Sequence, residues 1–468
     1  MEQESAESSG AVLTDPGWRT GGSDTAVPVL GGGRCRYASL DHAASTPPFV
    51  AVQDAVTRFG GWYANVHRGT GFKSRLSSWL FEDARRATLA FVGADPATAL
   101  ALFTRNTTES LNHVAQRLPL YGRCVVTTMM EHHSNDLPWR RVAEVVRVGL
   151  DAAGGVDEAA LKQALRDHEG RVKILAVSGA SNVTGIVNPV HRWARWAHDV
   201  GARIVVDGAQ WVPHRPVDMR AADDPEHLDF LAFSAHKMYA PYGVGVLIGP
   251  RADFEAGEPR LVGGGTVDVV DTERVVFADA PDREEAGTPC IVGAVALAAA
   301  IREYRRIGWD AIIEHERELN GIARRGLREI PGVTLYGDGD NEHLAVIAFN
   351  VEGVPHALVS AVLSDEWGMG TRSGCFCAHG YVKTLLGIDP TRSQDFEERI
   401  IAGDRREIPG AVRASFGLGS TQVDAQRLVE AVGAIAAGRF DPGYTLDSAT
   451  GEYDHAGAEA NFAEYFSA

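Results

Sequence analysis

Lys237 is the side chain with the clearest potential for covalent chemistry. It closes the run SAHK (234–237), which follows an apolar stretch that predicts a buried strand. A lysine that is desolvated at the end of a strand favours its neutral amine, and that amine can form a Schiff base. An isolated lysine is more often a solvated loop residue. Lys237 is not isolated, because Asp207 ends a second apolar stretch, IVVDGAQ, thirty positions earlier.

The pair of Lys237 and Asp207 matches the needs of one cofactor, pyridoxal phosphate. Its aldehyde attaches to a lysine, and its pyridinium nitrogen pairs with a carboxylate so that the ring can withdraw electrons. Asp207 on its own would more safely be assigned as a helix N-cap. The two residues together favour the cofactor.

Strand-like and helix-like segments alternate around these residues. Strands are predicted at 172–181, 202–210, 228–238 and 242–250, the last one antiparallel or at an edge, and a helix at 189–201. This alternation predicts an α/β fold with a mostly parallel sheet and helices on both faces. Ligands bind at the carboxyl ends of such strands. Polar clusters follow three of those ends, at 181–182, 207–210 and 234–237.

The pattern changes after about residue 290. A long helix is predicted at 291–308, and a strand at 343–353 and a helix at 424–438 follow. We expect a large cofactor-binding domain over 51–299 and a smaller α+β domain formed by 27–50 and 300–438. Disordered acidic tails are expected at 1–26 and 439–468, where the last residues form a short amphipathic stretch that could dock or fray.

Composition excludes several classes of protein. The 468 residues are 45% hydrophobic, enough for a large core, so a disordered chain is not expected. The net charge of −17 argues against nucleic-acid binding. No apolar run is long enough to span a membrane, and the first residues do not resemble a secretory signal. Five scattered cysteines indicate reduced thiols and a cytoplasmic protein.

The stretches VDGAQWVPHRPVDM and DFLAFSAHKMYAPYGVGVL resemble the class V aminotransferase family of fold-type I pyridoxal-phosphate enzymes, and most of all its cysteine desulfurase and selenocysteine lyase branch. The resemblance runs from LDHAAST (40–46) to RASFGLGST (413–421). Between these lie ANVHRG, NTTES, EHHSNDLPW, SNVTGIVNP, EEAGTP and RSGCFCA. It implies a large domain on a seven-stranded, mostly parallel sheet and a smaller α+β domain.

The resemblance implies roles for residues around the cofactor ring. Lys237 would carry the cofactor, and Asp207 would pair with its pyridine nitrogen. Gln210 would lie near its phenolic oxygen. His132 would stack on the ring and help to move protons, although taken alone it could be a structural surface histidine.

The resemblance also assigns the phosphate site. Thr107 and Thr108 would bind the phosphate together with Ser234 and His236. The two threonines are expected at a helix N-terminus, which favours an anion but could also be a simple cap. Thr288 would reach the phosphate of a partner subunit, which implies a homodimer.

The substrate side of the site centres on Cys377. Asn182, Arg372 and Arg413 would bind the substrate, with Arg413 gripping its carboxylate as a bidentate fork. Cys377 matches the position of the nucleophilic cysteine in the resembled branch, and basic neighbours such as Arg372 and His379 could lower the pKa of its thiol. The alternative is that Cys377 only fills space.

The sequence departs from the family pattern in three places, two of them next to this cysteine. Cys375 and Phe376 replace the paired histidines usual before the nucleophile, in a run that resembles the molybdenum-cofactor sulfurase branch. Gly71 replaces a second histidine, and a charged piece at 384–410 lengthens the link from Cys377 to Arg413. Cys375 could resolve an oxidised or persulfidic neighbour. The spacing Cys375-x-Cys377-x-His379 is too tight for the usual zinc patterns, so no metal site is predicted.

We therefore expect a homodimeric enzyme that converts L-cysteine to L-alanine and holds the sulfur as a persulfide on Cys377 for an acceptor protein. One alternative keeps the cofactor but makes the protein a C–S lyase, epimerase or aminotransferase for another amino acid, with Cys377 dispensable. A second alternative, a non-enzymatic sulfur-transfer scaffold, is disfavoured by the complete set of cofactor residues. Selenocysteine and larger thio-substrates remain open.

Overall fold

The structure, a computed structural model, describes residues 18–466 except 68, 407 and 459. Most of the N-terminal tail predicted at 1–26 therefore lies outside the described residues. Residues 18–26 pack against the body instead of continuing a tail. The indole Nε1 of Trp18 donates a 2.7 Å hydrogen bond to the Leu418 carbonyl, and Thr20 is buried.

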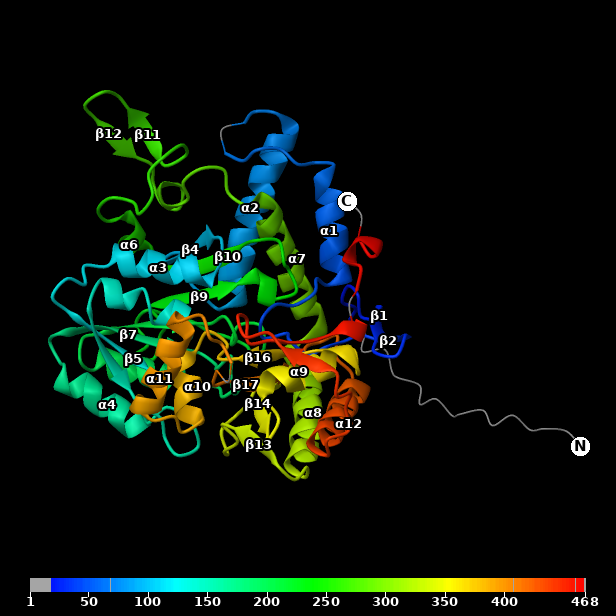
Figure 1. Cartoon of the computed structure of the whole chain (residues 1–468). Helices are drawn as coiled ribbons and strands as arrows, with labels where there is room; N and C mark the ends of the chain where they lie inside the picture. The colour runs from blue at the N-terminus through cyan, green and yellow to red at the C-terminus, as the bar shows by residue number, and fades with distance from the viewer. Residues whose placement is uncertain (1–17, 68, 407, 459, 467–468) are drawn as a thin grey trace, which may run out of the picture.

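A seven-stranded sheet forms the centre of the large domain (Figure 1). Five neighbouring strands are parallel, as predicted. The predicted 242–250 strand is antiparallel to both of its neighbours and lies inside the sheet, because one further strand pairs with its outer side. In spatial order the strands are β4 (Ala99–Thr104), β10 (Gly245–Pro250), β9 (Phe230–Ser234), β8 (Arg203–Asp207), β7 (Val172–Ser178), β5 (Cys124–Thr128) and β6 (Glu144–Val148).

Successive residues of a strand point to opposite faces of the sheet, and here the residues on both faces are apolar. Helices therefore cover both faces. Ile204 and Val206 of β8 pack in the same core as α7, whereas Val205 packs in the core that includes α3. On the α7 face, α1 and α2 both pack against α7 (Figure 1). The helices of the large domain are α1 (Val50–Gly60), α2 (Phe72–Phe91), α3 (Thr107–Arg117), α4 (Glu158–Asp167), α5 (Val190–His198), α6 (Arg251–Glu255) and α7 (Ile291–Ile307).

The smaller domain has a four-stranded antiparallel sheet in the order β13-β14-β17-β16. Its own apolar core holds the sheet against three helices. The strands are β13 (Val333–Tyr336), β14 (Val346–Val351), β16 (Arg372–Gly374) and β17 (Ala411–Ser415), and the helices are α8 (Trp309–Arg328), α9 (His356–Asp365) and α12 (Gln422–Ala436).

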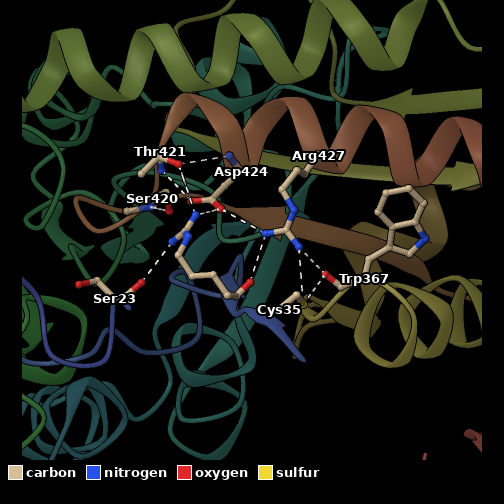
Figure 2. A network of polar contacts seen from close by, with 9 residues as sticks. Ser23, Cys35, Trp367, Ser420, Thr421, Asp424 and Arg427 are labelled. Atoms are coloured by element: carbon tan, nitrogen blue, oxygen red, sulfur yellow. Dashed lines mark hydrogen bonds and ion pairs between the residues drawn. The ribbon is translucent and has the colours of Figure 1, made fainter. Parts of the chain in front are cut away.

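A polar network fastens the N-terminal segment to this smaller domain (Figure 2). Asp424, which is buried in the first turn of α12, contacts Arg36 and also caps the helix through Thr421. Arg427 donates to the carbonyls of Arg36 (3.2 Å) and Trp367 (2.6 Å). The segment itself contains β1 (Ala26–Val29), β2 (Gly33–Arg36) and β3 (Ala38–Ser39), and β3 pairs in parallel with β15 (Met369–Gly370).

Two further segments complete the fold after Cys377. The segment after Cys377 begins with α10 (His379–Leu385), and the charged piece at 384–410 contains α11 (Pro390–Ile401), whose first turn is capped by Asp389. The C-terminal segment forms a hairpin of β18 (Tyr444–Leu446) and β19 (Tyr453–His455) that contacts α9. A separate hairpin, β11 (Val267–Val270) with β12 (Val275–Phe277), projects from the large domain (Figure 1). None of the helices in the described part of the chain is both long and apolar enough to cross a membrane.

Candidate active site

A cavity of about 310 Å³ lies where β7, β8 and β9 end, at the carboxyl edge of the sheet. Twelve of the residues predicted for the site line it, and Thr288 is the exception. The twelve are Thr107, Thr108, His132, Asn182, Asp207, Gln210, Ser234, His236, Lys237, Arg372, Cys377 and Arg413. The expected convergence of polar strand ends is therefore confirmed.

Asp207 faces this cavity from the end of β8, and Lys237 faces it from the short turn that follows the neighbouring strand β9. Burial lowers the pKa of Lys237 to about 8, although the Asp207 carboxylate opposes the shift. Burial also raises the pKa of Asp207, against the 2.9 Å hydrogen bond that its Oδ1 accepts from the Ala209 N–H. The site thus holds a desolvated amine beside a desolvated carboxyl group, and each would gain from a partner that completes its surroundings.

His132 enters the cavity with one defined tautomer. The backbone N–H of Ser134 donates to its Nδ1 at 3.1 Å, so Nδ1 is an acceptor and the proton of the neutral ring sits on Nε2. Burial, with Lys237 nearby, lowers the pKa of His132 to about 3. His132 is therefore a neutral ring with one N–H to offer.

The first turn of α3 forms one end of the cavity. Thr107 donates its backbone N–H to Ser234 Oγ at 2.8 Å, and the Thr108 hydroxyl lies 2.6 Å from Ser134 Oγ. The predicted helix N-terminus at these threonines is confirmed. Gly245 permits it, because a Cβ at this position would lie 2.5 Å from the Asn106 backbone. The helix dipole and the hydroxyl groups gathered at this end make it suitable for an anion.

Gln210 and His236 complete the cofactor side of the cavity. Gln210 is buried and donates to the Ala43 carbonyl at 2.6 Å. His236 Nδ1 lies 3.2 Å from Ser45 Oγ, and burial beside Lys237 lowers the pKa of His236 to about 4. Both residues reach across to the 43–45 segment, which closes the cavity on that side.

Asp41 joins the two arginines of the site, a role that the sequence did not reveal. Its Oδ1 accepts from Arg413 Nη2 at 2.6 Å, and its Oδ2 accepts from Arg372 Nε at 3.0 Å. Arg413 is buried, and its Nε has no hydrogen-bond partner among the described residues. This donor is left unsatisfied by the protein, and Arg413 lines the cavity. The position of Asp41 in the LDHAAST motif was the only signal available in the sequence.

Cys377 sits in a strained loop between β16 and α10. Phe376 and Cys377 have φ angles of 52° and 55°, in the left-handed region that non-glycine residues rarely adopt. Asn182 Nδ2 donates to the Phe376 carbonyl at 2.8 Å, and the His133 N–H donates to the Cys377 carbonyl at 2.7 Å. The loop keeps the Cys377 side chain exposed at the cavity.

Cys375, two residues earlier, is placed quite differently. Its Sγ lies 3.1 Å from the Pro409 carbonyl, and burial raises the pKa of its thiol to about 11. Its own carbonyl accepts from the Ala378 N–H at 2.8 Å, and this bond, with the one from the His133 N–H to the Cys377 carbonyl, fixes the turn. Only Cys377 of the pair therefore presents its sulfur to the cavity.

Thr288 and Glu131 are the remaining residues to place. Thr288 is exposed and does not line this cavity, so its predicted reach to a partner subunit stays a prediction. Glu131 is buried beside His132 and accepts from Thr128, Ser178 and Asn135, each at 2.7 Å. Burial raises the pKa of Glu131 to about 7. Glu131 was not among the predicted site residues, because nothing in the sequence marks its carboxyl group as buried beside the cavity.

Comparison with known proteins places this geometry in a family. The class V aminotransferase model matches residues 38–428. A probable cysteine desulfurase of Vibrio cholerae is 34% identical over 403 residues, which cover 84% of this chain and 92% of the relative. A cysteine desulfurase of Haloferax volcanii is 34% identical over 405 residues, covering 84% and 88%.

Comparison with solved structures supports the same family. The apo cysteine desulfurase of Thermococcus onnurineus superimposes with a TM-score of 0.76 at 32% identity, covering 86% of this chain and 95% of that one. An S-sulfonic acid form of an Escherichia coli cysteine desulfurase gives 0.73 at 31% identity, covering 86% and 96%. The fold-type I architecture expected from the motifs is confirmed. The chain therefore belongs to the class V aminotransferase family of pyridoxal-phosphate-dependent enzymes.

Proposed function

We propose that this enzyme is a cysteine desulfurase that converts L-cysteine to L-alanine and retains the sulfur as a persulfide on Cys377. The observation that carries the proposal is the exposed Cys377 thiol in the same cavity as Lys237 and Asp207. Several relatives that match most of the chain bear the name cysteine desulfurase, which supports the same activity.

The residues present fit pyridoxal phosphate. Lys237 would attach it, Asp207 would pair with its ring nitrogen, and Gln210 would approach its phenolic oxygen. The phosphate would occupy the first turn of α3, among the hydroxyl groups of Thr107, Thr108 and Ser234 and the ring of His236. When bound, the cofactor supplies an electron sink for the substrate Cα.

His132 would act as the proton carrier of the site. Its pKa of about 3 keeps the ring neutral at working pH, so it can stack on an aromatic cofactor without placing a second positive charge beside Lys237. The Nε2–H can donate a hydrogen bond, since Nδ1 accepts from the Ser134 N–H; to carry a proton, the ring would have to release that bond and take the proton up on Nδ1. The sequence predicted that His132 stacks on the cofactor and helps to move protons, and the geometry adds that Nε2 is the ring nitrogen that carries the proton.

The substrate carboxylate would bind beside Arg413. Arg413 lines the cavity as a buried cation, and the exposed Arg372 lines it as well. Asp41 already holds both guanidinium groups, so an incoming carboxylate must share them with it. Asn182 supports the site differently, because its side chain holds the Phe376 carbonyl and so positions the Cys377 loop.

The sulfur step balances without any outside oxidant. Cys377 Sγ forms a bond to the substrate sulfur, and the bond from that sulfur to the substrate Cβ breaks. The electron pair left on Cβ takes up a proton, which yields alanine, and Cys377 keeps the S–SH group. The net reaction joins one thiol and one cysteine to give one persulfide and one alanine.

The test compares the two neighbouring thiols. Alanine and protein persulfide are measured with L-cysteine for wild type, Cys377→Ser and the matched control Cys375→Ser. We expect Cys377→Ser to form no persulfide and Cys375→Ser to retain most activity. Full alanine formation by Cys377→Ser would instead make the enzyme a lyase, and a Lys237→Ala variant that still binds the cofactor covalently would contradict the whole site assignment.

We propose a homodimer and a protein acceptor for the sulfur. Large aromatic side chains are exposed just after α1 and along α2 on the large domain, and a second copy could bury them. They are Trp62, Tyr63, Phe72 and Trp79. The predicted reach of Thr288 to a partner's phosphate requires such a dimer. The cytoplasmic location inferred from the reduced cysteines stays a prediction.

A further inference from the structure

A second cluster of ligand-type side chains lies on the opposite edge of the large-domain sheet. His198 ends α5, and Asp229 directly precedes β9, whose other end carries Ser234 of the cavity. His227 lies two residues before Asp229. A five-residue strand spans about 13 Å, so this cluster is separate from the catalytic cavity.

The three side chains converge on one point. His198 Nε2 is 3.0 Å from Asp229 Oδ2, and His227 Nε2 is 3.5 Å from Asp229 Oδ1. One ligand atom from each residue can be chosen so that all three lie within 4.8 Å of one another. Asp229 is buried, and both rings are only slightly exposed, so the group is held within the fold.

Backbone carbonyls fix the tautomer of both rings. His198 Nδ1 lies 2.8 Å from the Pro225 carbonyl, and His227 Nδ1 lies 2.6 Å from the Asp224 carbonyl. A carbonyl only accepts, so each Nδ1 must carry the proton. In the neutral rings Nε2 is then a bare lone pair, and both lone pairs face the Asp229 carboxylate.

Two lone pairs facing a carboxylate need positive charge between them. The two rings stack with centroids 4.3 Å apart at 21°, so both bring Nε2 to the same carboxylate. A single divalent cation satisfies both rings and the carboxylate at once.

The surroundings also match those of metal ligands. Histidines that bind metals commonly donate their other N–H to a backbone carbonyl, as both rings do here. The Ile204 N–H donates to Asp229 Oδ2 at 2.9 Å and orients the carboxylate. A cavity of about 100 Å³ adjoins His227 and Asp229, although His198 does not line it.

We propose that His198, His227 and Asp229 form a divalent-metal site, and that Zn²⁺ is the ion that suits two imidazoles, one carboxylate and a water. Such an ion would clamp the end of α5 and the 219–229 loop to the start of β9. Zinc bonds of about 2.0–2.2 Å require the ligand atoms to move closer together than they are here, so binding would draw the two rings inward. The sequence predicted no metal site, since these ligands follow none of the usual spacings.

Zinc binding to defined variants tests this site. The holoenzyme is treated with a chelator and dialysed against micromolar Zn²⁺, and bound zinc per chain is measured for wild type, His198→Gln and His227→Gln. His191→Gln is the matched control, because His191 Nδ1 also lies 2.9 Å from a backbone carbonyl in the same loop. We expect the two ligand variants to lose one zinc per chain, with affinity at least about 100-fold weaker, and the control to bind like wild type.

X-ray absorption of the zinc-loaded wild type decides the question even if a variant fails to fold. A shell of nitrogen and oxygen ligands at about 2.0–2.1 Å supports the site, whereas a sulfur shell at about 2.3 Å would place the zinc on a cysteine thiol and overturn the proposal. Equal zinc binding by wild type and folded His227→Gln would also overturn it. The yellow colour of the bound cofactor reports folding of each variant independently of zinc.

Discussion

The different placement of Cys375 and Cys377 predicts a large difference in their reactivity toward an alkylating reagent. Cys375 has a thiol pKa of about 11 because it is buried against the Pro409 carbonyl, whereas an ordinary thiol has a pKa near 8.5. At pH 7 the thiolate fraction of Cys375 is therefore about 300-fold below that of an ordinary thiol. Cys377 is exposed at the cavity.

The intrinsic nucleophilicity of a thiolate partly offsets this difference. It rises with pKa with a Brønsted slope of about 0.4–0.5, which returns roughly tenfold over the shift of about 2.5 units. Cys375 should thus react with iodoacetamide about 20–30-fold more slowly than an exposed ordinary thiol, before any further loss from burial. Its rate should still rise about tenfold per pH unit between pH 7 and 10, because its pKa lies above that range.

Mass spectrometry of single variants measures both rates. Cys375→Ser leaves only Cys377 of the pair, and Cys377→Ser leaves only Cys375, so fragment ions need not separate two modified cysteines. We expect Cys377 to be alkylated first and desulfurase activity to fall in step with its modification. Faster labelling of Cys375, or full activity after complete alkylation of Cys377, would refute the placement of the thiols and the proposed nucleophile.

Three further outcomes follow from the cavity. Desolvation lowers the Lys237 pKa from 10.5 to about 8, which costs the cofactor-free protein about 3 kcal/mol of stability below pH 8. This cost disappears as the pH rises to 10.5. Lys237→Met should therefore be more stable than wild type at pH 7, and the unfolding free energies of the two proteins from urea titrations should converge by pH 10.5. His132→Gln should retain the cofactor but lower kcat about 10²–10⁴-fold, while His133→Gln should change it little in steady-state assays. Gly245→Ala should weaken cofactor binding and cost about 1–3 kcal/mol of stability in thermal melts, because its Cβ would press on the backbone of Asn106.

Local sequence patterns predicted much of the fold and the candidate site. The helix at 291–308 appears as Ile291–Ile307, and the strand that ends at Asp207 appears as Arg203–Asp207. Both are set by apolar periodicity and by residues that end an element, so they need no knowledge of distant contacts. The polar residues after each strand were also identifiable, because a parallel sheet brings such ends to one edge.

The contacts across the chain could not be predicted in this way. Asp41 meets Arg413 only because the 41 segment lies beside β17, and the N-terminal residues 18–26 join the body through contacts such as that of Trp18 with Leu418. The C-terminal hairpin likewise lies against α9, where composition alone predicted an acidic tail. Charge and composition describe a segment in solvent, and packing partners are absent from that description.

The sequence by itself determined the family, the α/β sheet and the residues at the ends of its strands, because periodicity and short motifs encode local conformation. Only the tertiary structure decided which sulfur of Cys375 and Cys377 faces the cavity, which nitrogen of His132 holds the proton, and that His198, His227 and Asp229 meet. These properties depend on burial and on hydrogen-bond partners that come from distant parts of the chain, and no local pattern specifies them.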